Sequence, residues 1–366
     1  MKPEWHIGAE ANTEYVFPTD NFFKGANKEN KHITASTGAT LRAGFSFNPE
    51  SKEGILYPGL YQGVALGIRT FYHDNLLGTP GSAYAFQGAP IARMGNRFHL
   101  DYEWNFGIAF GWKHNGYIPI ETSSVISTAV TAHMGVALKF RYDLTDNWTL
   151  SFGLGGTHFS NGNTSWRNAG LNSGGINIGI DYTINPLPTS TEEYLTLKEE
   201  ADKKRWIYDI MAFGAWRQRL VYLGNPEIEY LAPGKYPVLG VQFAPAIKLN
   251  RWVAVGPALD LQWDKSADLS RYWINDGNMT DLKFRHVPVE KQISVGISAH
   301  AELTAPIFSV NAGIGYNVIN PKGDRAFYQS LTVKVFFTKN LYLNVGYRLG
   351  AFKDPHNIML GIGYRI

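Results

Sequence analysis

Residues 100–112 read LDYEWNFGIAFGW, and this stretch indicates the fold class more clearly than any other. Every second residue is apolar, which is the period of a β-strand with two different faces. The other face carries acidic, amide and small residues. The apolar positions are Leu100, Tyr102, Trp104, Phe106, Ile108, Phe110 and Trp112.

The same alternation recurs along the chain, for example over 130–142 and 308–316. We count about sixteen such runs. They cover residues 4–17, 33–48, 58–73, 84–94, 98–113, 126–144, 147–160, 173–184, 206–219, 236–248, 251–263, 289–304, 306–319, 325–337, 341–351 and 356–366. Long strands with a wholly apolar face and aromatic tips favour a transmembrane antiparallel outer-membrane β-barrel over a soluble sheet.

Connection lengths alternate between long and tight, as they do between the outer and periplasmic ends of such barrels. If the long connections are the outer ones, this alternation predicts that both termini lie in the periplasm and that the 161–172 loop lies outside. The exception is the polar segment 185–205, which could form a short helix and separates two eight-strand halves, 1–184 and 206–366. One large barrel and two tandem barrels both remain open.

Composition narrows the function classes. The chain has 366 residues, 14% aromatic and 18% charged, with a net charge of +3 that is not gathered in a basic tract. Nothing points to nucleic acid. Cysteine is absent, which excludes disulfides and thiolate chemistry. No metal-binding or phosphate-loop motif occurs, and we expect no cofactor. Met1 runs straight into a strand pattern, so we expect an export signal absent from this chain.

A candidate site lies at the outer end of the run 147–160. Every second residue from Trp148 onward faces lipid, and this count includes His158 and Ser160. The same count along the next strand places Asn172 on that face. Residues i and i+2 lie about 6–7 Å apart, so the imidazole can reach the hydroxyl and activate it as a nucleophile. A site that opens towards lipid takes a substrate lying in the bilayer, and lipid ester hydrolysis is the chemistry implied.

The residues His158-Phe159-Ser160-Asn161, followed by Asn168 and Gly170, resemble the signature of the PagL-type lipid A 3-O-deacylases, an acyloxyacyl hydrolase-like family of outer-membrane barrels. The resemblance covers the first half of the chain. It implies Ser160 as nucleophile, His158 as general base, Asn161 with the Gly162 backbone in the oxyanion region, and Asn168 and Gly170 in the returning loop. The family's third residue is a glutamate, where this chain has Asn172.

The expected function is therefore a lipid A deacylase, a serine hydrolase acting on lipopolysaccharide in the outer leaflet, with phospholipid esters as the nearest alternative substrate. The competing class is a non-enzymatic porin-like or structural barrel with a relic site. The segment that begins at Asn147 resembles the one that begins at Asn340, and in this alignment Ala351 and Lys353 stand in place of His158 and Ser160, so the second half lacks the motif. The sequence does not decide whether the protein forms a homodimer. Arg167, Lys24, Lys28 and Lys31 are weaker candidates for binding lipid A phosphates.

Overall fold

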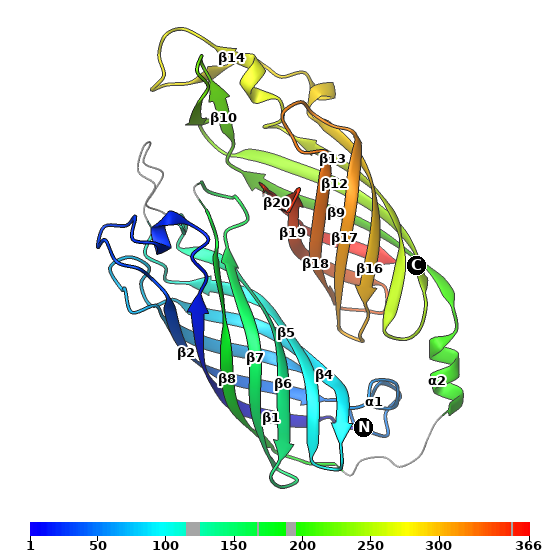
Figure 1. Ribbon diagram of the computed structural model, residues 1–366. Coiled ribbons are helices and arrows are strands. Elements are labelled where there is room, and N and C mark those ends of the chain that lie inside the picture. Colours follow the sequence, from blue (N-terminus) through cyan, green and yellow to red (C-terminus); the bar gives the residue numbers. More distant parts are fainter. Residues whose placement is uncertain (115–124, 167, 188–194, 353) are drawn as a thin grey trace. The chain divides into compact units, whose positions relative to one another are not determined.

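The computed structural model describes residues 1–114, 125–166, 168–187, 195–352 and 354–366. The chain divides into two compact units. The first contains Met1–Asn161 and Arg167–Lys198, and the second contains Gly162–Trp166 and Glu199–Ile366. Each unit is built around an antiparallel β-barrel (Figure 1). The expected all-β fold is thus confirmed, and the two-barrel alternative is the one that the chain adopts.

The first barrel has eight strands, each paired with its neighbours in chain order, and β8 pairs with β1 to close the cylinder. Closure leaves no strand edge with unpaired backbone groups. The strands are β1 (Glu4–Val16), β2 (Ala35–Ser46), β3 (Tyr61–Thr70), β4 (Gly81–Met94), β5 (Phe98–Phe110), β6 (Val130–Asp143), β7 (Trp148–Ser160) and β8 (Leu171–Thr183).

The second barrel also closes with eight strands, since β18 pairs with β19 and β21 pairs with β9. Its last strand is in two pieces. The segment β20 (Asp354–Ile358) pairs with one end of β19, and β21 pairs with the other end. The barrel strands are β9 (Arg205–Arg217), β12 (Tyr236–Lys248), β13 (Val253–Asp264), β16 (Ile293–Leu303), β17 (Phe308–Ile319), β18 (Phe327–Phe336), β19 (Leu341–Gly350) and β21 (Leu360–Arg365).

Short elements lie in the connections. Helix α2 (Leu195–Asp202) lies in the segment where the sequence indicated a short helix, whereas α1 (Lys52–Leu56) was not expected. None of the helices in the described ranges is long and apolar enough to cross a membrane. The other elements are η1 (Asn21–Phe23), β10 (Leu220–Leu223), β11 (Ile228–Leu231), η2 (Leu269–Tyr272), β14 (Trp273–Ile274), β15 (Lys283–Phe284) and η3 (Val289–Lys291).

The outward faces of both barrels are apolar. Val136, Leu154 and Ile178 are 67%, 53% and 59% exposed, and similar side chains recur around both walls. A water-soluble protein rarely exposes contiguous apolar surface on this scale, whereas a lipid-facing barrel requires it. Trp104 was expected on the outward face with the other apolar residues of its run. It is buried instead, and its Nε1 donates to Gln87 Oε1 at 3.3 Å.

The inward faces carry paired charges. In the first barrel, Lys139 lies between Glu10 and Glu103, with Nζ 2.6 and 2.8 Å from their carboxylates. In the second, Lys334 bridges Asp209 and Glu302, at 2.6 Å from each. Buried charges need such partners, because an unpaired ion in a low-dielectric interior is strongly destabilising. Inward-pointing side chains occupy both interiors, as expected for eight strands, and a cavity of about 40 Å³ remains inside the first barrel.

Long loops cap the first barrel at the end opposite the N-terminus (Figure 1). They contribute a buried apolar cluster that reaches down to the last inward residues of the strands. Its members are Val16, Phe22, Phe23, Ile33, Phe71, Leu77, Ala109, Trp112, Val125, Ile126, Phe159 and Leu171. Because Phe159 and Leu171 belong to β7 and β8, this cluster fixes the ends of the two strands that carry the predicted site.

Candidate active site

The register between β7 and β8 places His158 directly opposite Asn172. Side chains of directly opposed residues in an antiparallel pair lie on the same face of the sheet. This face is the outward one, since it continues from the exposed residues Leu154 and Ile176, which also oppose each other. The structure therefore brings together two of the three residues predicted as catalytic.

His158 and Asn172 are joined by a hydrogen bond of 2.7 Å between Nδ1 and Oδ1. An amide oxygen only accepts, so Nδ1 carries the proton in this bond. The neutral imidazole then has an unprotonated Nε2, which is the nitrogen that a general base uses. Asn172 thus selects the ring tautomer needed for catalysis, although its amide brings no negative charge to stabilise an imidazolium.

Ser160 is the last residue of β7, two positions beyond His158, and only 5% of it is exposed. The side chain of Asn168 lies over it and donates from Nδ2 to the Ser160 Oγ at 2.7 Å. Ser160 accepts in this bond, so the bond does not use the hydroxyl proton that a base must remove.

The loop between β7 and β8 turns sharply, and several of its residues have a positive φ, among them Gly162 at +64° and Gly170 at +70°. Gly170 has a second reason to lack a side chain. A Cβ there would lie 3.1 Å from Cε1 of His158, which is tighter than ordinary contact. The glycine expected in the returning loop therefore makes room for the imidazole ring.

Two asparagines have different contacts from those expected. Asn161, predicted in the oxyanion region, donates from Nδ2 to Ser127 Oγ at 2.9 Å. Asn168, predicted among the site-shaping residues of the returning loop, is the one whose amide reaches Ser160. Ser127 was not anticipated, because it precedes β6 and no local pattern links it to the motif. Arg167 lies outside the described residues.

Beneath the His158–Asn172 pair, the outer wall lacks side chains. Gly156 opposes Gly174 in the next outward row. Among the described residues, a Cβ at Gly156 would have one neighbour within 4 Å, the backbone oxygen of Ser173 at 3.3 Å, whereas a Cβ at Gly174 would approach the Phe17 ring at 3.2 Å. The wall therefore has an open position directly below the imidazole, bordered on one side by an aromatic ring.

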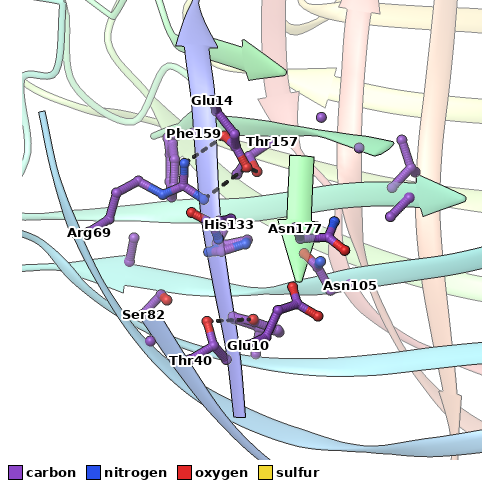
Figure 2. Close-up of a pocket in the computed structure, with 18 of the residues that line it drawn as sticks. Glu10, Glu14, Thr40, Arg69, Ser82, Asn105, His133, Thr157, Phe159 and Asn177 are labelled. Atoms are coloured by element: carbon purple, nitrogen blue, oxygen red, sulfur yellow. Dashed lines mark hydrogen bonds and ion pairs between the residues drawn. The ribbon is translucent and has the colours of Figure 1, made fainter. Parts of the chain in front are cut away.

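On the inner face, the same strand end is packed rigidly. The Phe159 ring lies edge-on to Trp112 and to His133, with centroids 5.1 and 5.0 Å away. Figure 2 shows Phe159 and Thr157 beside Glu14 and Arg69 in the interior of the first barrel. The candidate residues His158 and Asn172 thus lie on the outward face, and the inward residues of the same strand end pack against the barrel interior.

The basic candidates of the first loop are exposed. Lys24, Lys28 and Lys31 extend from a loop that Asn27 holds together, with Nδ2 donating to the carbonyls of Phe22 and Lys31 at 2.7 Å each. An ordered loop with exposed ammonium groups suits phosphate binding, but these contacts do not connect it to His158.

The second barrel contains a Ser–His–Asn arrangement that sequence reasoning missed. Ser298 Oγ lies 2.8 Å from His300 Nε2, and His300 Nδ1 lies 2.7 Å from Asn311 Oδ1. All three are buried on the inward face, and Ser298 donates its hydroxyl proton to Asp260 at 2.6 Å. This proton assignment opposes nucleophilic use, so the cluster is a polar part of the barrel interior.

The fold and the site define a class: an all-β protein with two eight-stranded barrels, the first of which carries the hydrogen-bonded His158–Asn172 pair on its outward face, with Ser160 two residues further along β7. Residues 206–366 match the family model described as acyloxyacyl hydrolase, C-terminal domain. The expected resemblance is therefore found in the second half rather than the first. Its location is a correction, because the motif that suggested the family lies outside the matched range.

Other comparisons add little. No match was found among curated proteins. A mutant of the Rh. blastica porin is 11% identical over 100% of both chains, with a TM-score of 0.18. An outer membrane channel from Pseudomonas putida F1 is 9% identical over 100% of this chain and 96% of its own, with a TM-score of 0.24. The siderophore receptor PirA from Acinetobacter baumannii is 8% identical over 100% and 74%, with a TM-score of 0.24. TM-scores this low assign no activity.

Proposed function

We propose that the protein is an outer-membrane serine esterase that removes an ester-linked acyl chain from lipid A in the outer leaflet. The observation that carries this proposal is the outward-facing His158–Asn172 hydrogen bond beside Ser160. A polar pair on a lipid-facing wall costs free energy, so its presence there favours a functional role. Its tautomer, its neighbouring hydroxyl and its position at the strand end all suit attack on a lipid ester.

In the proposed reaction, His158 Nε2 takes the hydroxyl proton as Ser160 Oγ attacks the ester carbonyl. The tetrahedral intermediate collapses, the imidazolium returns its proton to the leaving alkoxide, and an acyl-enzyme remains on Ser160. Water, activated by the same imidazole, then releases the fatty acid and restores Ser160. Overall, one ester and one water are consumed, and one alcohol and one fatty acid are formed.

The oxyanion needs donors, and the loop offers three. Asn168 Nδ2 already lies at Ser160 Oγ. The Asn161 amide, which bonds Ser127 in the resting structure, and the Gly162 backbone N–H are the donors that the family resemblance implies. We propose that Asn161 exchanges its bond to Ser127 for the oxyanion when substrate binds. A positioned donor of this kind contributes about 3–4 kcal/mol to stabilisation of the transition state.

The surroundings suit a phosphorylated lipid. The open position at Gly156 leaves space for an acyl chain directly below the imidazole. Lys24, Lys28 and Lys31, with Arg167, are proposed to meet the phosphate groups above the membrane surface. Neither feature separates lipid A from other anionic lipids, so the choice of lipid A rests on the motif resemblance and on the acyloxyacyl hydrolase name of the family matched by 206–366.

The second barrel is proposed to be structural. Its Ala351, aligned with His158, has a φ of +47° and carries no group capable of acid–base chemistry. A non-enzymatic barrel with a relic site is the competing reading. Its porin-like form is disfavoured because both interiors are filled with paired charges.

The test is mass spectrometry of lipid A incubated with purified protein in mixed vesicles, beside the Ser160→Ala and His158→Ala variants. We expect the wild type to remove one hydroxyacyl group and both variants to lose activity by about 10⁴-fold or more. Retained barrel folding of the variants is checked by their heat-dependent migration in detergent gels. If folded wild type leaves the spectra of several lipid A forms and phospholipids unchanged, the enzyme proposal fails. The non-enzymatic barrel with a relic site is then favoured.

A further inference from the structure

We propose that Glu14, inside the first barrel, is a positioning residue for the His158–Asn172 pair. The activity measurement that tests this inference rests on the proposed function, whereas the effect of Glu14 on the His158 tautomer is independent of it. Glu14 is on β1 and points to the interior, so it cannot touch a substrate on the lipid side. It acts instead through the two hydroxyl residues adjacent to the catalytic pair.

Those residues are Thr157 and Ser173. They oppose each other in the β7–β8 ladder, one step from His158 and Asn172, and their side chains point inward. Thr157 Oγ1 donates to Glu14 Oε1 at 3.0 Å, and Ser173 Oγ donates to Glu14 Oε2 at 2.5 Å. One carboxylate therefore ties together the two strands that present the site, directly behind it.

The carboxylate is itself fixed. Arg69 on β3 holds it with both terminal nitrogens, at 2.5 and 3.1 Å, and also donates to Ser36 at 3.0 Å. Glu14, Arg69 and Ser36 are all buried. A buried bidentate pair has little freedom to rearrange, so the position of the two hydroxyl groups is set by β1, which pairs with β8, and through Arg69 and Ser36 by β3 and β2.

The neighbouring sequence explains why such support matters here. The next two opposed pairs below Thr157 and Ser173 are Gly156–Gly174 and Gly155–Gly175. Four glycines in adjacent rows provide no cross-strand side-chain contacts and leave the backbone freer than other residues do. The Thr157–Glu14–Ser173 contact is thus the support between a glycine-rich stretch and the His158–Asn172 pair.

The barrel offers a matched control. Glu10 lies on the same strand, and its carboxylate also belongs to an interior ion-pair network, with Arg42 at 2.9 Å and Lys139 at 2.6 Å. Figure 2 shows Glu10 away from the Glu14, Thr157 and Arg69 group, towards the other end of the cavity. Glu10→Gln therefore disturbs a comparable pair without touching the support of the site.

The experiment compares full-length Glu14→Gln and Thr157→Val with Glu10→Gln and Thr157→Ser, in vesicles containing lipid A. We expect kcat to fall about 10²-fold in the first two, with KM within about twofold, because a small misplacement of catalytic groups costs this much. The two controls should keep wild-type kcat. Nitrogen NMR of the His158 ring should show mixed tautomers in Glu14→Gln and Thr157→Val, and only the Nδ1–H form in the controls.

Folding is checked for every variant by heat-dependent gel migration. Wild-type kcat and a single His158 tautomer in folded Glu14→Gln and Thr157→Val would overturn the inference, as would equal losses in Glu10→Gln. Should the wild type hydrolyse no lipid, the proposed function fails, and the tautomer spectra alone decide the positioning role of Glu14.

Discussion

At the scale of single residues, we expect Asn172 to limit the rate of the proposed reaction. Its Oδ1 holds the His158 ring in a useful tautomer at 2.7 Å. The imidazolium formed during catalysis would nevertheless meet a neutral amide, where the resembling family has a carboxylate. A charged hydrogen bond is roughly twice as strong as a neutral one, so this site is expected to be slow.

We predict that Asn172→Glu raises kcat about tenfold, which corresponds to about 1.4 kcal/mol of transition-state stabilisation. The measurement is the initial rate of fatty-acid release from lipid A vesicles. Asn172→Gln is the matched control, because a glutamine side chain is as long as a glutamate side chain but carries no charge. Equal rates for the two variants would show that charge at this position is not limiting.

The sequence allowed part of the site to be predicted. Period-2 alternation sufficed to predict that His158 and Asn172 lie on the same outward face, because the direction of a side chain along a strand depends on local geometry. The contacts of Asn168 with Ser160 and of Asn161 with Ser127 were not predictable. They depend on how a loop of left-handed residues folds over the strand end, which alternation does not encode.

At the scale of elements, the facing glycines of β7 and β8 are proposed to determine which acyl chains fit. We predict that Gly156→Leu lowers kcat/KM for long-chain lipid A about tenfold or more, because the new side chain occupies the open position below His158. A short-chain soluble ester should be hydrolysed at a rate within about twofold of wild type. A comparable loss with both substrates would indicate a distorted site instead.

The strands themselves were predictable to within a few residues because a lipid-facing wall imposes strict alternation. The last strand shows where this reasoning stops. The run 356–366 is divided at Met359, which lies between β20 and β21 and is buried. Helix α1 was also missed, because five residues capped by Ser51 contain too few turns to show a helical period. Pairing and local caps, rather than hydrophobicity, determine these details.

At the scale of the whole molecule, the sequence left open one barrel or two, because strand alternation is the same in both. The structure has two, each with a filled interior. We predict that the purified protein gives no steady ion current in planar lipid bilayers, since paired Lys, Arg, Asp and Glu side chains block both interiors. Stable single-channel steps from folded protein would contradict this and favour the porin-like alternative.

The outward placement of His158 and Asn172 has a consequence for enzymology. In the proposed function, a face that opens sideways into a lipid leaflet would encounter its substrate by lateral diffusion in two dimensions. The relevant concentration is then the mole fraction of substrate in the membrane, not its amount per litre. Diluting the target lipid with inert lipid would slow turnover, while diluting the whole suspension would not. Membrane composition would therefore regulate this protein without any dedicated regulatory site.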